Sequence, residues 1–124
     1  GKRIHLHQTG RGKAILAFLP DERVEEIIEV RGLPEATPNT TTSRERLFEE
    51  LAAIRDRGYA IDTEERVEGL RCIAAPVTDE DDWALGAISV AGPTTRLQGD
   101  YFETELPETV RQVANVIELN LSYS

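Results

Sequence analysis

The chain has a single cysteine, Cys72, and no methionine. One cysteine cannot form an internal disulfide, so the fold does not depend on oxidation, and a reducing cytoplasm is the expected location. No apolar run approaches the roughly 20 residues of a membrane-spanning helix, and no signal-peptide pattern opens the sequence. Because the chain begins at Gly1 and lacks methionine throughout, we expect a processed chain or a fragment of a longer protein.

Basic residues are also scarce. The chain has 14 basic against 23 acidic residues, a formal net charge of -9. Such a surface repels phosphate backbones and anionic membranes, so this segment is expected to bind nucleic acid poorly. Only Lys2 and Lys13 are lysines. An acidic, lysine-poor surface that keeps its arginines leads to the hypothesis of a halophilic host with a high-salt cytoplasm; an ordinary acidic domain is the alternative.

A length of 124 residues suits one domain, or part of one. Apolar periodicity and turn residues divide the chain into helical segments, then strands, then a helix again. Predicted helices cover residues 10–19, 21–31 and 44–57 and a segment from Leu106; a loop covers 33–43, and strands cover 59–62, 70–77 and 83–91. A tight hairpin next to helices predicts the α+β class, with an antiparallel sheet flanked by helices.

Local signals mark where the predicted helices begin and end. Thr9 and Ser43 are suited to cap the first and third helices through their hydroxyl groups. Pro20 is expected to end the first helix and open the second. Gly32 terminates the second helix, and Gly58 is expected to end the third in a left-handed conformation.

The predicted hairpin turns through an acidic tip. If the tip is symmetric about Glu80 and Asp81, Cys72 lies directly opposite Ser89. One face of the hairpin then carries small side chains, and the other carries branched ones suited to packing on helices. In this register Leu70 pairs with Ala91 and Ala74 with Ala87 on the small face, while Ile73 pairs with Ile88 and Val77 with Ala84 on the branched face. A face of small side chains leaves room for a ligand.

The stretch "TGRGKA" invites comparison with a phosphate-binding loop, but that motif needs a glycine where His7 stands and a hydroxyl where Ala14 stands. We instead expect the backbone N–H groups of Gly10, Arg11 and Gly12, at a helix start, to be unpaired and to face outward. There they could bind an oxygen anion such as a carboxylate. The alternative is that the glycines only allow close helix packing.

Cys72 could be a nucleophile, a metal ligand, a wall of a pocket or a core residue. A nucleophile needs a nearby base, and the candidates are His5 and His7. Buried cysteine is common, which favours the core over catalysis. The cysteine, the two histidines and Asp62 lack metal-ligand spacing, so neither a metal site nor a cofactor is predicted. Asp62 follows a strand directly, so it could point at whatever the sheet holds.

Four separated blocks together resemble a known family. They are "LHQTGRGKAILAFLP" (6–20), "TPNTTTS" (37–43), "LFEELAAIRDRGYAIDTEERVEGLRCIAAPV" (47–77) and "GAISVAGPTTRL" (86–97). In this order and spacing they resemble the C-terminal effector-binding domain of IclR-family transcriptional regulators. The resemblance covers most of the chain, and the third block has no simple compositional origin.

The resemblance implies a GAF-like α+β domain that binds a small-molecule effector. It also implies homodimers or homotetramers, and an N-terminal winged helix-turn-helix domain, absent from residues 1–124, through which the family contacts DNA. In the family the first helix and strands of the effector domain precede "LHQTG". We therefore expect residues 1–124 to form a partial effector-binding domain, without membrane contact.

The resemblance also implies which residues contact the effector. The family pocket is formed at the "TG" helix start, by the aspartate after "GYA", by the "GLRC" strand and by the serine of the "IS" strand. In this sequence the corresponding effector-binding residues are Gly10, Arg11, Asp62, Leu70, Cys72 and Ser89. Many members carry a second serine where this chain has Ala91, so we expect a less polar pocket.

The less polar pocket favours a larger or more apolar carboxylate over a very small keto acid. Two other functions remain open at this point. One is a cysteine-dependent enzyme or redox domain that uses Cys72. The other is a structural oligomerisation module, in which no cavity forms beside Cys72 and Ser89.

Overall fold

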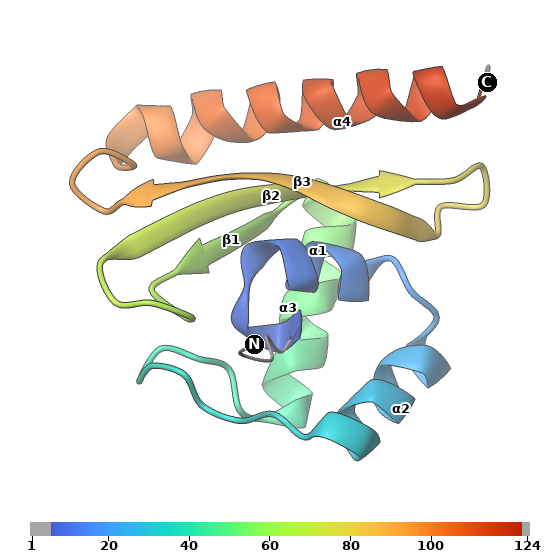
Figure 1. Cartoon of the computed structure of the whole chain (residues 1–124), viewed down its shortest axis with the longest axis vertical. Helices are drawn as coiled ribbons and strands as arrows, with labels where there is room; N and C mark the ends of the chain where they lie inside the picture. Colours follow the sequence, from blue (N-terminus) through green and yellow to red (C-terminus); the bar gives the residue numbers. More distant parts are fainter. Residues whose placement is uncertain (1–5, 123–124) are drawn as a thin grey trace, which may run out of the picture.

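The computed structural model describes residues 6–122 and places a three-stranded antiparallel sheet between helices (Figure 1). The helix α4 lies along one face of the sheet, and α1 and α3 lie on the other (Figure 1). The elements are α1 (Gly10–Ala17), α2 (Asp21–Arg31), α3 (Arg44–Arg57), β1 (Ala60–Thr63), β2 (Leu70–Thr78), β3 (Ala84–Pro93) and α4 (Leu106–Ser122), with a short 3-10 helix at Leu6–Gln8 and a π-helical turn at Tyr101–Glu105. The predicted α+β class is confirmed.

Thr9, Ser43 and Gly58 cap the helices as predicted, whereas α1 ends at Ala17, before Leu19, and Pro20 is the residue that precedes α2. The Thr9 hydroxyl accepts a hydrogen bond from the Gly12 N–H at 2.9 Å, and the Ser43 hydroxyl accepts one from Arg46 at the start of α3. Gly58 ends α3 with φ 88°, and its N–H donates to the carbonyl of Ile54 at 2.7 Å. Only a residue without a side chain adopts this left-handed conformation freely, so glycine is the natural stop here.

The hairpin register differs from the symmetric prediction by two residues. Cys72 pairs with Ala91, and Ser89 pairs with Ala74, so Ser89 is a diagonal neighbour of Cys72 on the same face. Leu70 pairs with Pro93 and Val77 with Gly86, in place of the partners predicted for them.

Two separate irregularities cause the shift. At the tip, the Asp79 N–H bonds to the Trp83 carbonyl at 2.9 Å across a turn in which Asp82 has φ 64°. This turn is one residue longer than the symmetric one. A bulge beside Val77 then leaves Leu85 without a partner and adds a second residue. Since side chains alternate with period two, the two shifts together leave the β3 side chains from Gly86 onward on their predicted faces. Ala84 lies before the bulge and is shifted by one residue only, so it pairs with Thr78 and not with Val77 as predicted.

Two hydrophobic clusters lie on opposite sides of the sheet. The cluster under α4 holds branched and aromatic side chains, with Ile73, Phe102 and Val110 among its buried members. The other cluster lies beneath α1 and α3 and includes Cys72 and Ala74. α4 buries a narrow apolar face of Leu106, Pro107, Val110 and Ala114, whereas Val113 and Leu121 are about half exposed.

Candidate functional site

A cavity of about 260 Å³ lies between the start of α1 and the small-residue face of the sheet. The structure places all six residues predicted to bind an effector around it, and it adds four others. The lining residues are Thr9, Gly10, Arg11, Asp62, Arg66, Val67, Leu70, Cys72, Ser89 and Ala91. The volume lies just below the range of about 300–1,000 Å³ typical of small-molecule sites, which suits a small organic molecule better than a nucleotide. Its presence beside Cys72 and Ser89 counts against a collapsed, purely structural module.

Gly10 brings α1 close to the sheet and shapes the inner end of the cavity. A Cβ at this position would lie 3.1 Å from the Cys72 sulfur and 3.6 Å from the Cβ of Ala74. The small side chains of β2 therefore do two things: they allow the helix start to approach the sheet, and they leave space beside it. Close helix packing was the alternative role that the sequence left open for the glycines. At Gly10 the structure shows both this close packing and an adjacent cavity.

The start of α1 is less open to an anion than predicted. The expectation of an outward, unpaired N–H is wrong for Gly12, whose N–H donates to Thr9. The Gly10 N–H donates to the carboxylate of Asp62. The protein thus supplies its own acceptors for two of the three groups, because a helix start leaves donors that a nearby carboxylate or hydroxyl can satisfy.

Asp62 lies in β1, one residue before its end, and is buried at the cavity. Its Oδ1 accepts a hydrogen bond from the Glu65 N–H at 2.8 Å. Burial raises the pKa of Asp62, while the N–H groups of Glu65 and Gly10 and the charges of Lys13 and Arg66 act in the opposite direction. The balance makes this carboxyl easier to protonate than an exposed one.

Cys72 is 8% exposed, and the pKa of its thiol is raised to about 11. Burial is the main cause and the negative charge of Asp62 adds to it, while a hydrogen bond with Ser89 and the charge of Arg11 act in the opposite direction. His7, one of the two bases considered for a nucleophilic cysteine, is buried with Nε2 2.8 Å from the carbonyl of Pro34 and does not line the cavity. His5 lies outside the described residues.

Two arginines line the cavity, Arg11 from α1 and Arg66 from the connection between β1 and β2. Within residues 6–122, neither side chain makes a hydrogen bond or an ion pair with another residue. The sequence did not predict Arg66 and Val67 as site residues, because the acidic connection after Asp62 has the composition of a solvated segment. The position of Asp62 is a signal that could have located Arg66 and Val67. Residues that follow a cavity-lining residue within a few positions must lie close to the same cavity.

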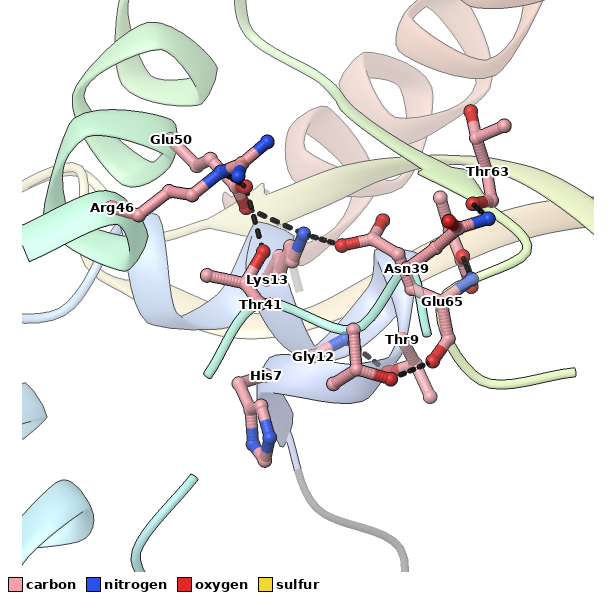
Figure 2. A network of polar contacts seen from close by, with 12 residues as sticks. His7, Thr9, Gly12, Lys13, Asn39, Thr41, Arg46, Glu50, Thr63 and Glu65 are labelled. Atoms are coloured by element: carbon pink, nitrogen blue, oxygen red, sulfur yellow. Dashed lines mark hydrogen bonds and ion pairs between the residues drawn. The ribbon is translucent and has the colours of Figure 1, made fainter. Parts of the chain in front are cut away.

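A second hollow, of about 710 Å³, lies between α3, β1 and the loop before α3. Its lining is rich in charged and hydroxyl side chains, among them Lys13, Thr41, Glu50 and Glu65. These groups already bond to one another: Lys13 pairs with both glutamates, and Thr41 donates to Glu50 at 2.7 Å (Figure 2). The smaller cavity keeps free cations beside an apolar wall, which makes it the better candidate for a ligand.

The chain matches a family model described as "Bacterial transcriptional regulator IclR C-terminal" over residues 1–119. The chain belongs to the IclR C-terminal domain family. The resemblance drawn from the four sequence blocks is thereby confirmed.

Curated relatives of this IclR C-terminal domain include transcriptional regulators. It is 45% identical over 118 residues to the probable HTH-type transcriptional regulator ArcR of Halobacterium salinarum, with 94% of this chain and 44% of that relative covered. It is 40% identical over 121 residues to the HTH-type transcriptional repressor AllR of Escherichia coli K12, with 98% and 44% covered. The chain thus spans less than half the length of these relatives. ArcR comes from a halophile, in agreement with the acidic, lysine-poor composition.

A solved structure with the same fold is the inducer-binding domain of the PobR transcription factor from Acinetobacter, a double mutant in complex with 3-hydroxybenzoic acid. The TM-score is 0.86 at 33% identity, and the match covers 95% of this chain and 67% of that one. Between residues 6 and 122 this IclR C-terminal domain has no helix of the length and hydropathy needed to cross a membrane.

Proposed function

We propose that this IclR C-terminal domain binds a small organic carboxylate in the 260 Å³ cavity and that binding modulates the operator affinity of a DNA-binding domain in a longer protein. The observation that carries the proposal is the pair of free arginines, Arg11 and Arg66, at a cavity whose remaining wall is largely apolar. A guanidinium group pairs with carboxylate through two parallel hydrogen bonds, which favours an acid over a neutral ligand.

The negative charge of the whole chain strengthens the argument that these two arginines form a site for an anion. A protein with a net charge of -9 repels anions in general, so attraction for an acid must come from a local arrangement of cations. PobR, which shares the fold, was crystallised with an aromatic hydroxy acid. Ala91, Leu70 and Val67 add apolar surface beside the arginines, in keeping with an acid that carries an apolar body.

The proposal extends to assembly, location and chemistry. The protein acts in the cytoplasm as a homodimer or homotetramer, and the ligand selects one of two arrangements because it binds one more tightly than the other. It touches DNA only through a domain outside residues 1–124. It does not act as an enzyme: a thiol with a pKa of about 11 is nearly all protonated at neutral pH and is a weak nucleophile.

The test compares acids with neutral analogues of the same shape. Glyoxylate, pyruvate, benzoate and 3-hydroxybenzoate are titrated by calorimetry and thermal shift beside benzamide, which lacks the charge. The aromatic acids are expected to raise the melting temperature in a saturable manner, and benzamide and the two small keto acids less so. If no acid binds, the effector role of the cavity loses its support.

The variant Arg66→Gln separates a specific contact from a general charge effect. Loss of a charge-assisted hydrogen bond is expected to weaken benzoate binding about tenfold. The matched control is Arg96→Gln, which removes the same charge from an exposed arginine outside the cavity. Equal weakening by both variants would show that net charge, not Arg66, attracts the acid.

A further inference from the structure

The segment that follows Asp62 forms one wall of the effector cavity and is held from behind. Asp62, Arg66 and Val67 line the cavity, while Thr63 and Glu65, between them, line the larger hollow on the other side. The wall is therefore a single thickness of chain. Its position depends on the groups that contact its outer side.

Lys13 provides the strongest of these contacts. Its side chain is 3% exposed, and its ammonium group forms ion pairs with Glu65 and with Glu50, the latter at 2.6 Å (Figure 2). A buried charge is costly unless it is paired, so the lysine holds both carboxylates close. Since Lys13 belongs to α1 and Glu50 to α3, the ion pair ties the wall to two helices.

The loop before α3 holds the same segment through its backbone. The Thr37 hydroxyl donates to the carbonyl of Glu64 at 2.5 Å, and the Thr40 hydroxyl donates to the carbonyl of Glu65. The Asn39 amide reaches the carbonyl of Thr63 at 3.4 Å. Glu64 has φ 58°, a left-handed conformation uncommon for a residue other than glycine, so the segment makes a turn that depends on support from its surroundings.

We propose that Lys13 is a positioning residue for effector binding: with Glu65 and the hydroxyls of Thr37 and Thr40 it fixes the wall that carries Asp62 and Arg66. Lys13 itself does not line the cavity, so it sets effector affinity through Glu65 and not by contact. This inference rests on the proposed function of the cavity. It adds a determinant of affinity on the far side of the wall from the ligand.

The two carboxylate partners of Lys13 offer a matched pair of variants. Glu65→Ala frees the wall, whereas Glu50→Ala removes a carboxylate that belongs to α3 and does not line the cavity. Each variant leaves Lys13 paired with the other carboxylate, so neither buries an uncompensated charge. Both are expected to lower the melting temperature, but Glu65→Ala alone is expected to weaken binding of 3-hydroxybenzoate, by about tenfold.

The threonines provide a second pair that changes no charge. Thr40→Val removes a hydroxyl that donates to the wall and that also accepts from the N–H groups of Ala36 and Thr37 in its own loop. Thr41→Val removes a hydroxyl that donates to Glu50. Both threonines are buried, and valine has nearly the same shape. Weaker binding is expected for Thr40→Val, with Thr41→Val within about twofold of the parent.

Amide hydrogen exchange in the ligand-free protein reports on the position of the wall whether or not an acid binds. It therefore tests the positioning role separately from the proposed function. The Glu65 N–H, bonded to Asp62, is expected to exchange faster in Thr40→Val than in Thr41→Val. If affinity follows melting temperature equally in all four variants, or if Glu65→Ala changes neither affinity nor wall exchange, the positioning role is overturned. If the exchange pattern holds while the parent binds no acid, the positioning of the wall is supported and the carboxylate function fails.

Discussion

On the α4 face of the sheet, Ile73 and Val77 pack with Phe102 in a cluster of wholly apolar buried residues. On the face covered by α1 and α3 (Figure 1), the small side chains of Cys72 and Ala74 leave space, and the ionisable side chains of Lys13 and Asp62 are buried. The first face gains free energy from apolar burial. The face covered by α1 and α3 gains less free energy from apolar burial, because it contains a cavity and buried ionisable groups that need partners. The densely packed apolar cluster and the cavity proposed to bind a ligand thus lie on opposite sides of one sheet.

The largest expected effect breaks the α4 face. Ile73 is 0% exposed, so Ile73→Ala is expected to destabilise the protein by about 2–5 kcal/mol, measured by urea unfolding. At temperatures where the variant stays folded, affinity for 3-hydroxybenzoate should change little. Ile88→Ala, at a partly buried position against the same cluster, serves as a milder control. A large loss of affinity in folded Ile73→Ala would contradict the separation of the two faces.

A smaller effect on stability, with a larger one on binding, is expected at Gly10. The added methyl group of Gly10→Ala would lie 3.1 Å from the sulfur of Cys72, so α1 must move from the sheet by a few tenths of an ångström. We expect a stability change within about 1 kcal/mol, because better helix propensity offsets part of the crowding. Affinity for 3-hydroxybenzoate, measured by calorimetry, should fall about tenfold.

Gly86→Ala is the matched control for this variant. Gly86 lies on β3, and a Cβ there meets no atom within 4 Å. Its affinity for 3-hydroxybenzoate should therefore equal that of the parent. Unchanged affinity in Gly10→Ala as well would mean that the approach of α1 to the sheet does not shape the binding site.

The smallest effect is expected at Cys72 near neutral pH. With a pKa of about 11 in place of 9.0, the folded thiol forms about a hundredfold less thiolate than an unfolded one. Alkylation by iodoacetamide at pH 7.5 should be slower by at least that factor in the folded protein than in urea. Fast alkylation of the folded protein would instead support the hypothesis of a cysteine-dependent enzyme.

The same shift has a definite sign in the pH dependence of stability. A raised pKa means that the folded state holds its proton more tightly than the unfolded state. The stabilisation from the neutral thiol is therefore complete below about pH 9 and is lost as the pH rises through about 11. Cys72→Ala should remove this component of the alkaline decline, as followed by thermal unfolding between these values.

Much of the fold could be predicted from short-range features. Thr9, Ser43 and Gly58 mark helix ends because their chemistry acts on groups within one turn of chain. The register of the hairpin could not be predicted in the same way. The left-handed Asp82 and the unpaired Leu85 each shift the pairing by one residue, and no single local signal marks either.

The site residues likewise divide into those located from the sequence and those that only the structure shows. Resemblance to the family located Cys72, Asp62 and the helix start, and the structure gathers them around one cavity. Arg66 was overlooked because an acidic connection has the composition of a solvated segment. The buried ion pairs of Lys13 were not predicted either. No residue near Lys13 in sequence indicates them, because its partners are 37 and 52 residues away.

The sequence by itself therefore determined the elements, their caps and which side chains share a face of the sheet, since each depends on spacing along the chain. Only the tertiary structure decided that the helix start meets Asp62, that Arg66 reaches the cavity and that Lys13 supports the wall behind it. These contacts join segments that are far apart in sequence. Their free energies arise from burial and from pairing of charges, which exist only once the chain has packed.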